Sequence, residues 1–155
     1  MAAHSALTGA DLHEPKGAST ATSGQAYLAN GSGSGSWQSL NSANAERIMV
    51  TIQDVSTAGS TWVVPAVAGI ITQINTVLYA PIATTDCGLS FEIAGAPITD
   101  GNITIAFSGS AAGDLDSSSP SAARTLTNTQ AIEIISNGAS TSPASATVTF
   151  VVDVS

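Results

Sequence analysis

Residues 144–154 have the sequence ASATVTFVVDV, and this stretch decides the fold class. Large apolar side chains occupy every second position, at Val148, Phe150 and Val152. Such alternation is the pattern of a β-strand with one buried face, because successive side chains of a strand point to opposite sides. The stretch therefore predicts a strand whose apolar face contributes to a hydrophobic core.

Similar short segments rich in β-branched residues follow one another from Ile48 onward, separated by Gly, Pro, Asp and Asn. In one of them Ile103, Ile105 and Phe107 form an apolar face. The predicted strands are residues 48–52, 60–64, 69–79, 88–93, 101–107, 131–136 and 144–154. This spacing predicts an all-β fold with a single antiparallel β-sandwich or jelly-roll-like domain over residues 45–155, with a small barrel as the alternative.

Two segments of this region differ from the strand pattern. Residues 41–49 carry a weak helical signal, a capping residue followed by Glu46. Residues 108–123, SGSAAGDLDSSSPSAA, are predicted to form the long loop of the domain. Loops of this length in compact domains are commonly functional or mobile.

Residues 1–44 are dominated by Gly, Ser, Ala, Thr and Asn, and the run NGSGSGS at residues 30–36 has the composition of a flexible linker. A few large side chains are nevertheless spaced along the segment, and a purely flexible spacer would not need them. We interpret residues 1–44 as an extended arm that becomes ordered on a partner, the alternatives being a floppy terminus or a small addition to the domain. The predicted partner-binding residues are Leu7, Leu12, His13, Pro15, Tyr27, Leu28 and Trp37.

The charge balance argues against several partners. Three basic residues stand against eleven acidic ones, for a net charge of −8. Nucleic acid and anionic membrane surfaces both attract clustered Lys and Arg, so neither is an expected partner. The sequence has neither the apolar run of a membrane-spanning helix nor a conventional secretory signal, so we expect action in the compartment of synthesis or in a particle assembled there.

Residue sets typical of catalysis are not evident in the sequence. Both histidines, His4 and His13, lie in the arm, so a Ser-His-Asp or Cys-His arrangement cannot be completed within the β-domain. The single Cys87 excludes a disulfide framework and is expected to be a small buried hydrophobe. Asp114 and Asp116 could contribute to a Ca²⁺ site, but nothing nearby supplies the remaining charged ligands, and an acidic turn is the alternative. We expect a non-enzymatic protein without cofactor or metal.

The surface of the β-domain is predicted to favour association. Its polar positions are mainly Ser, Thr and Asn, so exposed faces should be weakly charged and easily desolvated. Isolated sandwiches usually guard their edge strands with Lys, yet Arg47 and Arg124 are the only basic residues of this domain. We expect its edges to be covered by neighbouring subunits.

Two arm segments, LTGADLHEPKG at residues 7–17 and YLANGSGSGSW at residues 27–37, resemble N-terminal segments of tailed-bacteriophage virion proteins. Segments of the body are similar to the same group: IQDVSTA at 52–58, VAGIIT at 67–72, and ITI at 103–105 leading into GSAAGDLD at 109–116. The resemblance implies a head decoration or cement protein, commonly a homotrimer. Such a protein is made in the host cytoplasm and binds the major capsid protein on the outer surface of the capsid, where its arm holds capsomer junctions together.

The main alternative is a tail-fibre or head-fibre component whose β-domain recognises a host glycan or protein. A receptor-binding tip should expose aromatic side chains, whereas Trp62, Tyr79 and Phe91 fall inside predicted strands and are expected in the core. This expectation favours decoration. A hydrolase that uses Asp114 and Asp116, and an exported bacterial surface module, are less favoured.

Overall fold

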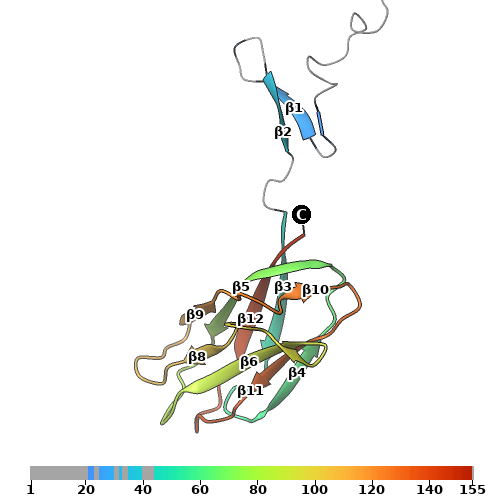
Figure 1. The fold of residues 1–155 in the computed structure, drawn as a ribbon. Helices are drawn as coiled ribbons and strands as arrows, with labels where there is room; N and C mark the ends of the chain where they lie inside the picture. Colours follow the sequence, from blue (N-terminus) through green and yellow to red (C-terminus); the bar gives the residue numbers. More distant parts are fainter. Residues whose placement is uncertain (1–20, 23–24, 30–31, 33–34, 40–43, 155) are drawn as a thin grey trace, which may run out of the picture. The chain divides into compact units, whose positions relative to one another are not determined.

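In a computed structural model, the described residues are 21–22, 25–29, 32, 35–39 and 44–154. The chain divides into two compact units, Met1–Ser42 and Ala43–Ser155, and each is described by itself (Figure 1). Strands are the regular elements of the described part, which contains no helix. Four residues of the predicted partner-binding set lie outside the described residues: Leu7, Leu12, His13 and Pro15.

The described element of the first unit is an antiparallel hairpin of β1 (Gln25–Ala29) and β2 (Gly35–Ser39). In these residues the chain is paired with itself. The partner-binding arm over residues 1–44 stays a prediction. Tyr27 lies opposite Trp37 in the pairing. Cross-strand aromatic pairs stabilise hairpins, and the intervening Gly and Ser suit a loop, so the run expected to be a linker also supplies the start of β2.

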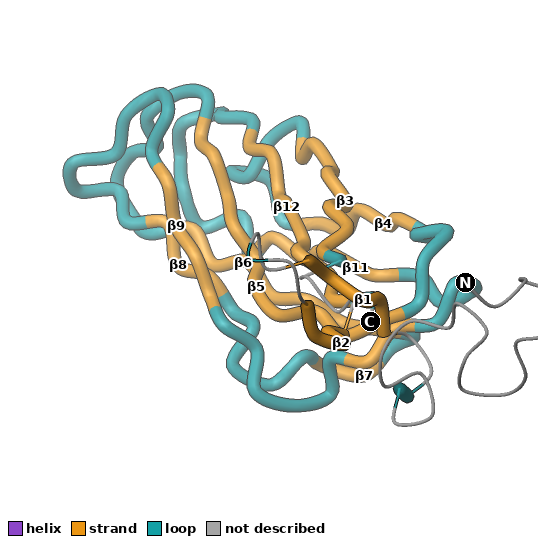
Figure 2. The backbone as a smooth tube through the Cα atoms, turned by 90° about the horizontal axis from the view of Figure 1, so that it is seen from above, coloured by secondary structure: helices purple, strands orange, loops and turns teal. Residues whose placement is uncertain are grey.

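The second unit, the β-domain, consists of two five-stranded antiparallel sheets (Figure 2). One sheet has the order β10-β5-β12-β3, with β9 also paired to β5; the other has the order β4-β11-β6-β7, with β8 also paired to β6. The strands are β3 (Ala45–Ile52), β4 (Gly59–Val63), β5 (Gly69–Leu78), β6 (Cys87–Ile93), β7 (Ala96–Pro97), β8 (Ile103–Ile105), β9 (Leu115–Ser118), β10 (Thr125–Leu126), β11 (Ile132–Ser136) and β12 (Ala146–Asp153).

The main strands pair in a nested order. β3 pairs with β12, β4 with β11, β5 with β9 and β6 with β8. Strands early in the sequence of the domain thus pair with strands late in it, and the later partners follow in reverse order. Nested pairing of eight strands in two sheets is the topology of a jelly roll. The predicted antiparallel sandwich of jelly-roll type is therefore confirmed, and the separate sheets exclude the small barrel.

The core lies between the two sheets and follows the predicted alternation. In β12 the inward residues Val148, Phe150 and Val152 have no exposed surface. The ring of Phe150 meets that of Phe91 from the opposite sheet edge-on, with centroids 5.5 Å apart and planes at 89°. Aromatic pairs prefer this arrangement. Cys87 is buried as a free thiol, which confirms its predicted role as a small core residue.

Three local predictions are wrong. The helical signal at residues 41–49 overlaps β3, where tertiary pairing with β12 overrides weak local propensity. The predicted loop at 108–123 contains β9, which pairs with the long strand β5. Phe107 is 44% exposed because β8 ends at Ile105 and the Phe107 amide then donates to the Asp86 carboxylate, 3.0 Å away, outside the sheet.

Two of the three aromatic residues expected in the core are on the surface. Trp62 is 61% exposed and Tyr79 is 56% exposed, whereas Phe91 is buried. Trp62 is paired with Glu133 on the outer face of its sheet, and Tyr79 follows the inward-facing Leu78. Strand alternation thus turns both side chains outward.

We expect Phe150→Ala to reduce the free energy of unfolding by about 3–5 kcal/mol, because it removes a ring from a closed core and leaves a cavity. The matched change Phe107→Ala removes the same ring from a surface position and should cost less than about 0.5 kcal/mol. Urea unfolding of the full chain measures both values. Similar losses for the two variants would contradict the placement of these rings.

Candidate interaction surfaces

The β1–β2 hairpin presents an aromatic pair on one face. Tyr27 and Trp37 meet edge-to-face, with ring centroids 5.4 Å apart and planes at 68°. Leu28 is exposed, and its pairing with Ser36 places it on the opposite face. The structure thus brings together two of the predicted arm residues and separates the third from them. Leu28 and the aromatic pair can therefore meet a partner only from two different sides of the hairpin.

Packing around Gly35 fixes this hairpin. A Cβ at Gly35 would overlap the carbonyl oxygen of Leu28 and come within 2.8 Å of the Tyr27 ring. Glycine is therefore required for the Tyr27 ring to pack over the backbone of β2. The paired strands carry no charged side chain, so a partner would meet aromatic, aliphatic, amide and hydroxyl groups.

The outer face of the sheet β9-β5-β12-β3 is rich in hydroxyl groups. The Tyr79 hydroxyl lies 3.0 Å from Thr147 Oγ1, which lies 3.3 Å from Thr51 Oγ1 on the neighbouring strand. Two transverse rows of this face are uncharged: Thr51, Thr147, Val77 and Leu115 in one, and Met49, Thr149, Asn75 and Ser117 in the next. This face agrees with the weakly charged surface expected from composition.

A cavity of about 550 Å³ opens on the same face. Arg47 lies on its border, in the row beyond Met49, and is half of the basic charge of the β-domain. The lining residues are Arg47, Met49, Asn75, Leu115, Asp116, Ser117 and Thr149. The lining combines two apolar side chains, Met49 and Leu115, with polar ones, and such a mixture is found on surfaces that bind other molecules.

The outer face of the second sheet carries an exposed tryptophan beside two carboxylates. Trp62 on β4, Glu133 on β11 and Glu92 on β6 form one transverse row. Like charges directly opposite each other destabilise a sheet slightly. Sequence reasoning missed this row because Trp62 lies between β-branched residues, so alternation did not reveal which side chains face the core.

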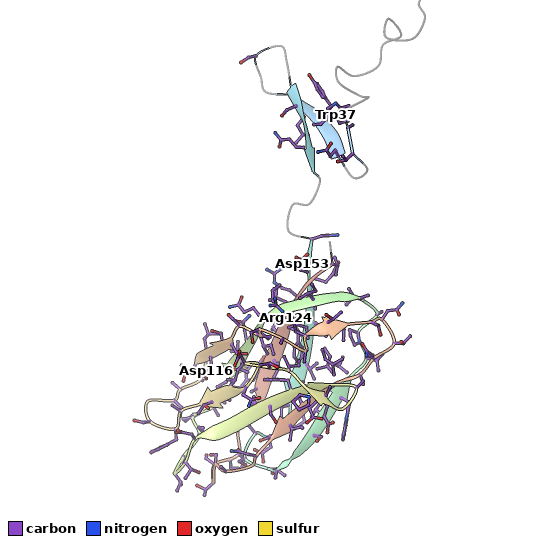
Figure 3. The ribbon with its side chains drawn as sticks, viewed as in Figure 1. Trp37, Asp116, Arg124 and Asp153 are labelled. Carbon is purple, nitrogen blue, oxygen red and sulfur yellow. The ribbon has the colours of Figure 1, made fainter. Side chains whose placement is uncertain are left out.

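Asp114 lies directly before β9, and Asp116 lies on β9 itself, at the edge of its sheet. The Asp114 carboxylate accepts a hydrogen bond from the Leu115 amide at 3.1 Å. Asp116 lies on β9 opposite the buried Thr76 (Figure 3), and burial, followed by the nearby Asp114 charge, raises the pKa of Asp116. In the described part of the chain, no group of three or more His, Cys, Asp or Glu residues is placed to hold a metal ion. The contacts of Asp114 are those of an acidic turn.

The Asp54 carboxylate accepts hydrogen bonds from groups of the turn that it begins and from the segment before β12. It accepts from the Ser56 hydroxyl at 2.7 Å and the Ser56 amide at 2.8 Å, and also from Thr57 and from the Ala144 amide. The Ser56 side-chain bond, followed by the Ser56 backbone bond, holds the pKa of Asp54 below its ordinary value. These contacts fix the connection between β3 and β4, so we assign Asp54 a structural role.

No membrane-spanning helix occurs among the described residues. Comparison with known proteins finds no matching family model, no similar curated protein and no similar solved structure.

We expect opposite pH responses from two carboxyl variants. The lowered pKa of Asp54 means that its charged form stabilises the fold above its unfolded pKa, near 3.9, and that this contribution is lost as pH falls. Asp54→Asn should therefore lower the urea midpoint at pH 7, with a difference from the parent chain that shrinks below about pH 4.

The raised pKa of Asp116 has the opposite effect on stability, because the folded state disfavours the charged form of this carboxyl. Asp116→Asn should raise the urea midpoint at pH 7, and this gain should shrink as the parent carboxyl takes up its proton at acid pH. Equal shifts of the same sign in the two variants would contradict these assignments.

Proposed function

We propose that this chain is a non-enzymatic virion protein that decorates the outside of a tailed-phage head. Residues 1–44 bind the major capsid protein across junctions between capsomers, and the β-domain covers the capsid surface and contacts further copies of itself. The observation that carries the proposal is the uncharged aromatic hairpin, which forms a unit separate from the β-domain. The resemblance of residues 7–17 and 27–37 to virion proteins supports the same assignment.

The hairpin supplies compact binding groups. Tyr27 and Trp37 are held against each other, so a partner groove would receive two rings that are already ordered. A desolvated aromatic anchor commonly contributes about 2 kcal/mol to binding. The resemblance implies a trimer, and three linked arms would bind far more tightly than one through effective concentration.

The β-domain supports a role in contact rather than in chemistry. The outer face of the sheet containing β12 presents threonine hydroxyls and scattered apolar groups, which lose little on desolvation compared with charged side chains. Jelly rolls recur in viral capsid domains and in lectins, so the fold is compatible with a virion role without deciding it. A net charge of −8 leaves nucleic acid and anionic membranes outside the proposed partners.

A fibre component with a receptor-binding β-domain is the second candidate, and one observation favours it. Trp62 and Tyr79 are exposed, which removes the argument from buried aromatics against a receptor-binding tip. Tyr and Trp combine an apolar body with a polar group and are enriched where proteins bind ligands and other proteins. In this alternative the N-terminal segment attaches to the particle and the β-domain faces the host.

Truncation tests which part of the chain attaches to the particle. We expect a chain that begins at Ala43, the boundary between the two units, to keep the folded β-domain and to lose binding to DNA-filled heads. Co-sedimentation of the full and truncated chains with separated heads and tails of the parent phage measures this. Retained head binding by the truncated chain would contradict the arm mechanism, and binding of the full chain to tails alone would favour the fibre.

Two aromatic substitutions separate the candidates further. We expect Trp37→Ala to weaken head binding about 30-fold, which corresponds to about 2 kcal/mol, because it removes one anchor. Tyr79→Ala removes an exposed aromatic ring from the β-domain and serves as the matched control. Titrated co-sedimentation should show control binding within about twofold of the parent chain. Loss of affinity in Tyr79→Ala alone would contradict attachment through the arm.

A further inference from the structure

The two sides of the jelly roll differ in how their edge strands are protected. On one side the edges are short, with four residues in β9, three in β8 and two each in β7 and β10. On the other side lie β3, with eight residues, and β4, with five. Figures 1 and 2 show β8 and β9 away from β3 and β4. Short edge strands are a common protection against strand addition, so β3 and β4 form the unprotected side.

The hydrogen-bond alternation shows which groups of β4 face outward from its sheet. The Ala94 amide donates to the Ala131 carbonyl, which places the odd-numbered residues of β11 in bonds to β6. The even-numbered residues of β11 therefore bond to Gly59, Thr61 and Val63 of β4. The amide and carbonyl groups of Ser60, Trp62 and the following Val64 point to the free edge.

The free edge of β4 also lacks the charged side chains that usually oppose strand addition. Residues 59–64 are Gly-Ser-Thr-Trp-Val-Val and carry no charge. Trp62 and Val64 are 61% and 62% exposed. A groove of about 390 Å³ opens beside the start of β4, with the core residues Ile52 and Ile134 in its lining. An uncharged edge with exposed apolar side chains is a template for another strand.

We propose that β4 pairs antiparallel with β4 of a second copy about a two-fold axis at Trp62. In this register Trp62 lies opposite Trp62 of the second copy, and Ser60 lies opposite its Val64. All of these residues direct their backbone groups to the free edge, so the pairing satisfies both donors and acceptors. It also keeps the inward Thr61 and Val63 of both copies on the core face of one continuous sheet.

The sequence of β4 favours a second copy as the occupant. Every cross-strand pair in the proposed register is uncharged, and the central pair joins two tryptophans. Glu133 lies one strand behind Trp62 in each copy, so the two Glu133 carboxylates are separated by three strand spacings, about 14 Å. That distance exceeds the Debye length at physiological salt, about 8 Å, so their repulsion is largely screened.

The proposed contact joins copies in pairs. It specifies one self-contact of the β-domain and does not depend on the head-binding role. A two-fold contact uses the same patch on both subunits and closes after two copies. If another surface of the chain forms a trimer, the β4 contact doubles the number of copies in the assembly. The full chain should therefore contain an even number of copies.

Mass measurement with surface variants tests the contact. In analytical ultracentrifugation of the full chain, we expect Trp62→Lys and Val64→Lys each to halve the mass, because Lys on an edge opposes strand addition. Phe107→Lys is the matched control, since Phe107 is 44% exposed just beyond β8 at the protected side, and it should leave the mass unchanged. Far-ultraviolet circular dichroism verifies that each variant is folded.

The masses decide the proposal in either direction. A parent mass of an even number of copies that is halved by the β4 variants supports it. A monomer of about 15 kDa, an odd number of copies, or a mass that the β4 variants leave unchanged would overturn it. Head binding is measured separately by co-sedimentation, so failure of the β4 contact and failure of the decoration role give different results.

Disulfide cross-linking tests the register. Mixed Ser60→Cys and Val64→Cys chains should form a dimer on oxidation, because paired residues have Cα atoms about 5.5 Å apart. Either variant alone should stay uncross-linked, since its two cysteines would be offset by about 13 Å along the strands. Cys87 is fully buried and provides no competing thiol. Equal cross-linking by a single variant would overturn the register.

Discussion

The pairing of β3 with β12 is the constraint on which the rest of the β-domain depends. It covers eight residues of each strand and brings together positions far apart in the sequence, such as Thr51 and Thr147, which are 96 residues apart. Within the segment between these two strands, further pairs are nested: β4 pairs with β11 and β6 with β8. Short contacts then fix the crossing to the second sheet: the Val55 amide donates to the Ala144 carbonyl at 2.8 Å, and the Val55 carbonyl accepts from the Ser136 hydroxyl at 2.6 Å.

The sequence predicts those strands in which the alternation of apolar and polar residues extends over enough positions to be recognised. β12 and β6 show it over eight and seven residues, and both bury every second side chain. In β4 Trp62 lies between the β-branched Thr61 and Val63, so the pattern does not show which face Trp62 occupies. β7 and β10 have two residues each, too few for any periodicity, and they exist because long neighbours offer them bonding partners. Tyr27 and Trp37 flank a Gly/Ser run in the sequence, which is compatible with a hairpin. The Gly/Ser composition of that run is also typical of a flexible linker, so the sequence alone does not predict the pairing.

The surfaces of the molecule divide into three kinds. The hairpin offers an ordered aromatic pair, the sheet containing β12 offers threonine hydroxyls, and the sheet containing β4 offers Trp62 beside Glu133 and Glu92. Each of these surfaces suits contact with another macromolecule. The two candidate functions differ in which surface meets the partner and which meets the host.

The nested topology has a consequence for synthesis. A nascent chain exposes β3 and β4 on the ribosome while their partners, β12 and β11, have not yet been translated. Folds dominated by such distant contacts form slowly, because loop closure must precede any gain from pairing. During that delay β4 has two free edges instead of one, and neighbouring nascent chains on a polysome carry the same uncharged strand. Rapid completion of the chain shortens the period in which copies can associate prematurely through this strand.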